Sequence, residues 1–229
     1  MAGIYVIAGV FMLISWLVSM RLKSKFREYS QIAFRGNLTG AQVAAKMLAE
    51  NNITDVKIIS VEGQLTDHYN PKDKTVNLSP EVYNGVSVAA AAVAAHECGH
   101  AVQHARAYAW LGLRSQLVPA VSFASRWTQW IILGGLLLMG LNLYLGGAIL
   151  LLGITLFGFS TFFAFVTLPV EFDASRRALA WLESSGTTSS REHDMAYDAL
   201  KWAALPYVVA ALASLAMLLY YISIFLRRR

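Results

Sequence analysis

Apolar and polar stretches alternate along the chain on a length scale that predicts membrane-spanning helices. Residues 4–20 and about 206–226 are uncharged and apolar, and no charged residue occurs from residue 127 to residue 167. About 20 helical residues cross a bilayer. The central stretch is about twice that length, and Asn142 with Gly146-Gly147 near its middle permits a tight turn. We therefore predict four spans, of which the second and third form a helical hairpin.

The first apolar stretch is predicted to be an uncleaved membrane anchor. A cleavable signal peptide carries its positive charge before the apolar run. Here the basic residues follow the run instead, as Arg21, Lys23, Lys25 and Arg27. Because basic residues beside a span favour the cytoplasmic side, we expect the N-terminus outside the cell and the segment from residue 21 inside. The prediction is a multi-pass protein of the cell (inner) membrane.

Between the first span and the hairpin, the pattern changes to that of a small folded domain. Thr39 and Gln42 form a capping-box pair, which begins an amphipathic helix that ends near residues 51–52. Ser79-Pro80 predicts the start of a short helix, and Ser87 is placed to cap a longer, alanine-rich helix. The β-branched and alternating residues predict three strands and a turn, at residues 56–61, 65–69 and 74–78 with the turn at 70–73.

After the hairpin the chain returns to a polar pattern. Pro169 is predicted to begin a new helix, which is polar over residues 171–183. A loop at residues 186–190 follows, and Ser189 with Glu192 restarts a helix that becomes the last span. The expected fold class is α+β and mostly helical, with about four transmembrane helices and a small sheet. The expected segments are an anchor (1–29), a folded domain (30–116), the hairpin (117–168), a polar helix and loop (169–204) and the last span (205–229).

Composition agrees with a membrane protein. The chain of 229 residues is 56% hydrophobic and 14% charged, whereas a soluble domain has about 25% charged residues. The net charge of +5 does not come from a basic stripe interleaved with aromatic residues, so no nucleic-acid partner is expected. One cysteine, Cys98, excludes an intrachain disulfide, in agreement with a reducing compartment.

The most informative motif is His96-Glu97-Cys98-Gly99-His100, near the end of the alanine-rich helix. Two histidines four residues apart on a helix differ by about 40° in direction, so both imidazoles reach one Zn²⁺. The intervening glutamate is then placed to take a proton from an activated water molecule. Such a string arises by chance on the order of once per hundred chains of this length, so the motif alone is suggestive.

A catalytic zinc site needs a third protein ligand. His104 lies about 12 Å along the helix axis from His96, beyond the reach of one ion, and is expected to pack or to support the ligands from behind. Glu171 is the better candidate, because a hairpin with two crossings returns the chain to the side of the membrane that it left. The alternative role for Glu171 is a membrane-edge carboxylate that stabilises a helix dipole.

The chain resembles the YugP-type neutral zinc metallopeptidases, membrane proteins related more distantly to the HtpX and CAAX-prenyl-protease gluzincins. The resemblance covers nearly the whole chain and rests on three segments, residues 67–80, residues 94–104 and residues 169–175. It implies a zincin-like fold with one Zn²⁺ per chain. It also implies His96, His100 and Glu171 as zinc ligands and Glu97 as the general base.

The resemblance leaves the residues behind the ligands unassigned. Gluzincins place an aspartate four residues after the ligand glutamate, and here that position is Ser175. The acid is instead at Asp173, which on a helix points about 200° away from Glu171.

Other residues near these segments have both a functional and a structural interpretation. His68, His193 and Tyr207 are conceivable stabilisers of an oxyanion, although a structural role is the simpler reading for each. Cys98 points about 200° from His96 and is expected to be a small buried residue. Residues 74–78 are either a strand that pairs with extended substrate or an ordinary sheet strand.

The predicted function is hydrolysis of peptide bonds in membrane-associated or unfolded proteins, with the active site on the cytoplasmic side of the bilayer. Two alternatives remain at this stage. The first is a non-catalytic zinc-binding membrane adaptor. The second is an intramembrane protease of the site-2 type, which the lack of an aspartate in the apolar runs disfavours. An oligomer or a regulatory membrane partner is compatible with either class.

Overall fold

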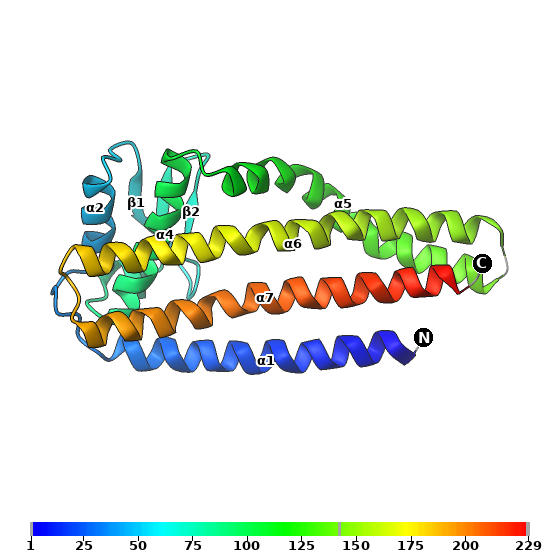
Figure 1. The fold of residues 1–229 in the computed structure, drawn as a ribbon, viewed down its shortest axis with the longest axis horizontal. Coiled ribbons are helices and arrows are strands. Elements are labelled where there is room, and N and C mark those ends of the chain that lie inside the picture. The colour runs from blue at the N-terminus through cyan, green and yellow to red at the C-terminus, as the bar shows by residue number, and fades with distance from the viewer. Residues whose placement is uncertain (1, 142, 228–229) are drawn as a thin grey trace. The chain divides into compact units, whose positions relative to one another are not determined.

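The computed structural model describes residues 2–141 and 143–227. In Figure 1 the chain is coloured from blue at the N-terminus to red at the C-terminus. The elements are α1 (Ala2–Ser30), α2 (Gly40–Glu50), β1 (Lys57–Ser60), β2 (His68–Asn70), β3 (Thr75–Leu78), α3 (Pro80–Asn84), α4 (Val88–Ala105), α5 (Ala109–Gly140), α6 (Leu145–Ser184) and α7 (Ser190–Leu226). The described chain is therefore mostly helical with a small sheet, as predicted.

The chain forms two compact units. Residues 18–112 and 169–206 make up one, which we call the site unit, and residues 1–17, 113–168 and 207–229 make up the other, which we call the apolar unit. Helices α1, α5, α6 and α7 each contribute residues to both units.

The core of the site unit lies between α2, α4 and the sheet. Strand β3 is central: it pairs in parallel with β1, through Ile58 and Val76, and antiparallel with β2, through Tyr69 and Val76. Val76 and Leu78 are fully buried, and the alanines of α4 pack in the same cluster. Small residues on α4 let neighbouring backbones approach closely, which brings the sheet and α2 against the helix that carries the histidines.

The capping predictions for this unit are confirmed. The Thr39 side chain accepts a hydrogen bond from the backbone of Gln42, whose own side chain accepts one from Thr39 in return. Ser87 caps α4 by accepting from the Ala90 backbone at 3.2 Å. Ser189 and Glu192 form the corresponding pair at the start of α7.

The second strand begins three residues later than predicted and ends one residue later. Strand β2 covers residues 68–70, whereas the alternating pattern indicated 65–69. Leu65 has a left-handed backbone with φ of 57°, which ends extended structure there. Asp67 instead turns toward β3, where its carboxylate accepts hydrogen bonds from the backbone and hydroxyl of Ser79.

The apolar unit contains the predicted hairpin, with its turn earlier than expected. Helix α5 ends at Gly140 and α6 begins at Leu145. Gly146-Gly147 is therefore inside α6 and does not form the turn, and Asn142 lies outside the described residues. A Cβ atom on Gly146 would lie 2.4 Å from the Met139 backbone nitrogen. This glycine serves the close approach of the two helices.

One predicted helix start is wrong: Pro169 lies inside α6. The helix predicted to restart at Ser189 and Glu192 is α7, and Pro206 lies inside it. A proline in a helix removes one backbone hydrogen bond, yet neighbouring turns and packing hold the helix together on either side of it. Three described helices are long and apolar enough to cross a membrane: α1, α6 and α7. Helix α5 does not meet that criterion in the described residues, so the number of four crossings stays a prediction.

Candidate metal centre

The two motif histidines and Glu171 converge within the site unit. His96 and His100 lie one turn apart on α4, and Glu171 comes from α6. The Glu171 Oε2 atom is 3.4 Å from His96 Nε2 and 3.5 Å from His100 Nε2. Among the described residues, these form the group of His, Cys, Asp and Glu side chains whose ligand atoms lie within 4.8 Å of one another.

The spacing of these donor atoms fits zinc. Zinc–nitrogen and zinc–oxygen bonds of about 2.0–2.2 Å, at tetrahedral angles, place two donors about 3.4 Å apart. The two imidazole rings are nearly perpendicular, with centroids 4.8 Å apart, so both nitrogens face a common point. Three protein ligands leave the fourth position of a tetrahedral ion for water or substrate, which is the arrangement of a catalytic site.

The second nitrogen of each histidine also has a partner. Ser175 Oγ lies 3.1 Å from His96 Nδ1, and Gln103 Oε1 lies 3.1 Å from His100 Nδ1. A partner on Nδ1 fixes the ring orientation and directs Nε2 toward the metal. Ser175 is the residue four positions after Glu171, where gluzincins carry an acid.

Gln103 also connects the metal site to Asp173. Its amide nitrogen donates to the Val170 carbonyl at 2.8 Å and to the Asp173 carboxylate at 2.9 Å. Asp173 in turn accepts from Arg176 and, at 2.5 Å, from Arg177. Asp173 therefore reaches His100 through an intervening amide and makes no contact with His96. Sequence reasoning did not single out Gln103; the available signal was a polar side chain one turn beyond His100 on a helix predicted to be buried.

A glycine sets the distance between α4 and α6. A Cβ atom on Gly99 would lie 2.5 Å from the Ala174 carbonyl oxygen, well inside van der Waals contact. The absence of a side chain at this position lets the two helices approach closely. Since the histidines and Glu171 lie on these two helices, the close approach brings the three ligands together.

Glu97 faces the sheet and belongs to no metal group among the described residues. It is 7% exposed, and its carboxylate accepts a hydrogen bond from the backbone of Tyr69. Its pKa is raised to about 7, mainly because the carboxylate is buried; His96 lowers the pKa, and the nearby carboxylates of Glu171 and Asp67 raise it. A buried carboxylate beside the ligands, with a pKa near neutrality, is suited to accept and release protons.

The Tyr69 hydrogen bond places Glu97 at the free edge of β2. Because β3 pairs on both sides, residues 74–78 form an ordinary sheet strand, and the alternative of pairing with substrate is wrong for them. The open edges of the sheet are β1 and β2, and β2 is the edge beside Glu97.

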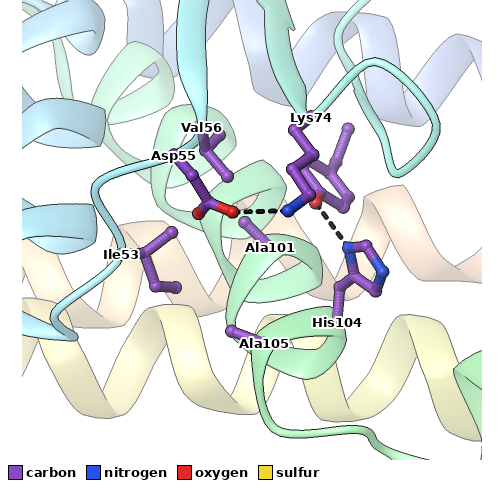
Figure 2. A pocket seen from close by; sticks show the side chains of 8 residues that line it. Ile53, Asp55, Val56, Lys74, Ala101, His104 and Ala105 are labelled. Carbon is purple, nitrogen blue, oxygen red and sulfur yellow. Dashed lines mark hydrogen bonds and ion pairs between the residues drawn. The ribbon is translucent and has the colours of Figure 1, made fainter.

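His104 lies away from the three ligands, at a small pocket shown in Figure 2. Its Nδ1 atom is 2.8 Å from the Tyr69 hydroxyl. The pocket has a volume of about 180 Å³, is floored by Ala101 and Ala105 of α4, and has a Lys74–Asp55 ion pair at its rim. His104 thus holds Tyr69 against α4 and is not a member of the metal group.

The remaining sequence candidates are not members of the metal group among the described residues. His68 is exposed, with Nδ1 2.8 Å from the Thr66 carbonyl oxygen. Tyr207 is 41% exposed and belongs to the apolar unit, and the partly buried His193 lies in the first turn of α7. Cys98 is fully buried, as predicted, and its thiol points to the Ala44 carbonyl.

Comparison with known proteins gives one family and one close relative. Residues 4–226 match the family described as "Putative neutral zinc metallopeptidase". The chain is 44% identical, over 216 residues, to the "Putative membrane protease YugP" of Bacillus subtilis (strain 168). The matched region covers 94% of this chain and 93% of that protein. No solved structure matches the chain.

Proposed function

The chain belongs to this family of neutral zinc metallopeptidases, and we propose that it is a membrane-embedded, zinc-dependent endopeptidase. Its substrates are membrane-associated or unfolded proteins. It acts in the cell membrane, with the active site on the cytoplasmic side and one Zn²⁺ per chain. The observation that carries this proposal is the convergence of His96, His100 and Glu171 beside a buried carboxylate that is not a ligand.

Each residue of the site has a role in this proposal. His96, His100 and Glu171 hold the zinc ion, which when bound supplies Lewis-acid activation of water and of the peptide carbonyl. Glu97 accepts a proton from the attacking water on its carboxylate and passes it to the leaving amine nitrogen. The Tyr69 hydrogen bond orients that carboxylate. Ser175 and Gln103 hold the two imidazoles with Nε2 toward the ligand group.

Substrate binding uses the edge of β2. The backbone of Tyr69 faces Glu97, so a peptide added as a further strand along β2 passes directly over the catalytic carboxylate. Main-chain hydrogen bonds of this kind bind many different sequences, because they do not depend on side chains. This mode of binding requires an extended chain, which unfolded or membrane-associated proteins provide.

Glu97 distinguishes an enzyme from a zinc-binding adaptor. A structural zinc site uses four protein ligands and has no need of a base. Burial of a carboxylate that has no ion-pair partner among the described residues is also costly, so its position beside the ligands favours catalysis. The site-2 alternative is disfavoured, because α4, which carries the motif, is not among the apolar candidate spans of the described chain.

Zinc content and proteolysis measured on the same preparation test the proposal. The full-length protein, purified in a non-ionic detergent, is expected to hold one zinc per chain and to cleave an unfolded protein such as reduced, alkylated lactalbumin. A chelator should stop cleavage, and added Zn²⁺ should restore it. Stoichiometric zinc without cleavage of unfolded or membrane-protein substrates would favour the adaptor.

A further inference from the structure

A cavity with two basic side chains lies beside the first turn of α4. Its volume is about 860 Å³, within the range of about 300–1,000 Å³ that ligand-binding clefts have. Lys23, Phe26 and Arg27 line it from α1, Leu65 from the loop before β2, and Ala90 from α4. We call it the basic cavity. All of these residues belong to the site unit.

The basic cavity lies on the face of α4 that also carries Glu97. Ala90 and Glu97 are seven residues apart on the same helix, so their directions differ by about 20° and they are about 10 Å apart along the axis. The loop that lines the cavity leads into β2, whose residue Tyr69 is hydrogen bonded to Glu97. A chain bound along the edge of β2 therefore extends into this cavity at one end.

The charges on α1 are divided between two faces of the helix. Arg21 lies over the Trp202 ring at 5.9 Å, and Lys25 pairs with Asp198 at 3.2 Å, so these two cations serve the contact with α7. Lys23 and Arg27, four residues apart, line the cavity together. Neither has an ion-pair or hydrogen-bond partner among the residues that the structure describes.

One acid also lines the cavity. The Glu81 carboxylate accepts a hydrogen bond from the Gln64 side chain at 3.0 Å. One acid and the two cations Lys23 and Arg27 together leave an excess of positive charge in the cavity. Both cations are exposed and available to a ligand. An anionic group is therefore the ligand that the cavity favours.

We propose that the basic cavity binds an acidic side chain of the polypeptide substrate, so that the protein selects substrates with Asp or Glu on one side of the cleaved bond. This inference rests on the proposed endopeptidase function. An extended chain rises about 3.4 Å per residue, so a distance of about 10 Å corresponds to about three residues. The selected acid lies about three to five residues from the cleaved bond, since lysine and arginine side chains are long.

An anionic lipid headgroup is the competing occupant, because Lys23 closely follows the apolar stretch of α1. The walls of the cavity favour the polypeptide. Besides α1 and the segment that follows it, the walls come from Gln64 and Leu65, from Glu81 and from residues 85–87 and 90. Residues 64–65 lead into β2, and Ala90 lies on the helix that carries Glu97.

Peptide binding to the full-length Glu97→Gln protein in an uncharged detergent tests this proposal without requiring turnover. The probes are two fluorescent 12-residue peptides with the same apolar centre, one with glutamates and one with glutamines in both flanks. We expect the acidic peptide to bind about five- to tenfold more tightly at low salt, and the difference to shrink at high salt. Lys23→Gln with Arg27→Gln should abolish the difference. Arg21→Gln with Lys201→Gln, which removes the same charge away from the cavity, should retain it.

Three results would overturn the proposal. The first is equal binding of the two peptides, and the second is an equal effect of the two double variants. The third is a Lys23→Gln/Arg27→Gln protein that still discriminates between the peptides but has lost affinity for phosphatidylglycerol vesicles. The last result would assign the cavity to lipid. Cleavage by the wild-type protein is measured separately. If the wild-type protein cleaves no substrate but the Glu97→Gln protein still binds the acidic peptide more tightly, the result counts against the proposed enzyme and not against the acidic-ligand site.

Discussion

Four positions in one stretch of α4 face three different parts of the site unit. His96 and His100 point toward α6, Glu97 is hydrogen bonded to the edge strand, and Cys98 points to α2. A helix advances about 100° per residue, so adjacent residues take part in different contacts. In the proposed function, this separation lets one short motif supply two metal ligands and a base, since Glu97 is not a member of the metal group.

Replacing the base tests its role directly. Glu97→Gln keeps the size of the side chain and its contact with the Tyr69 backbone, but removes the ability to accept a proton. We expect kcat/KM for peptide cleavage to fall by about 10²- to 10⁴-fold, the usual contribution of a general base, while bound zinc stays at one per chain. Cleavage at the wild-type rate would show that Glu97 is not the base.

Removing the third ligand should have the opposite effect on the metal. Glu171→Ala leaves two histidines, too few for tight zinc binding, so we expect zinc well below one per chain after gel filtration. The Glu97→Gln protein serves as the matched carboxylate control. Unchanged zinc in Glu171→Ala would exclude Glu171 as a ligand.

Gln103 is expected to position His100 from behind. Gln103→Leu removes its contacts with His100, Val170 and Asp173 together, and loss of such supporting contacts typically lowers metal affinity about 10- to 100-fold. Competition with a zinc-binding dye measures this without any activity assay. The thermal unfolding midpoint of the metal-free protein separates a loss of affinity from a loss of folding. Equal zinc affinity in a folded Gln103→Leu protein would contradict the positioning role.

Sequence reasoning reached the ligand group and not the residues behind it, for a physical reason. Ligand spacing within a helix follows from helix geometry, and hydropathy predicted Glu171 on the same side of the membrane as the two histidines. The partners of the two Nδ1 atoms depend on where α6 crosses α4. Gln103 is one turn from His100, but its contact with Asp173 exists only once the two helices are packed.

At the scale of helices, Gly99 determines how closely α4 and α6 approach. In Gly99→Ala the new Cβ would lie 2.5 Å from the Ala174 carbonyl oxygen, so α6 must shift and the Glu171 carboxylate moves with it. We expect bound zinc well below one per chain. Gly112→Ala is the control, because no atom lies within 4 Å of the added Cβ. If Gly99→Ala binds zinc as tightly as Gly112→Ala, the close approach does not set the site.

The α5–α6 pair of the apolar unit allows a similar test with adjacent glycines. A Cβ on Gly135 would lie 2.6 Å from the Leu150 backbone nitrogen, whereas one on Gly134 meets nothing within 4 Å. Overpacking of this kind costs about 1–3 kcal/mol, so Gly135→Ala should lower the thermal unfolding midpoint in detergent. Gly134→Ala should leave it unchanged or raise it slightly, because alanine favours helix. Equal midpoints for the two variants would mean that the helices do not depend on this contact.

Proline misled the sequence interpretation at this scale. Pro169 follows a long apolar stretch and was a reasonable helix start by local rules. It lies within a continuous helix instead.

At the scale of the whole molecule, the metal centre constrains how the chain crosses the membrane. Helices α1, α6 and α7 are the described helices that meet the length and apolarity criterion for a span. If the apolar part of α6 crossed alone between the histidines and Glu171, the ligands would lie on opposite sides. Yet His96 Nε2 and Glu171 Oε2 are 3.4 Å apart. An even number of crossings between the histidines and Glu171 keeps the ligands on one side of the membrane. This supports a crossing by α5 that pairs with the crossing by α6. Its apolar residues 127–140 are preceded by Arg126, whose side chain can extend to the membrane surface.

Cysteine labelling tests the crossing of α5. The chain has one cysteine, Cys98, and it is fully buried, so the unmodified protein is the unlabelled control. Tyr144 is 90% exposed between α5 and α6, and Arg191 is exposed in the first turn of α7. With four crossings, Tyr144→Cys lies outside the cell and reacts with a membrane-impermeant maleimide in intact cells. Arg191→Cys lies in the cytoplasm and reacts only after permeabilisation. If Tyr144→Cys also required permeabilisation, α5 would not cross the membrane. Glu171 could then lie on the same side as the histidines only if the apolar part of α6 did not cross either.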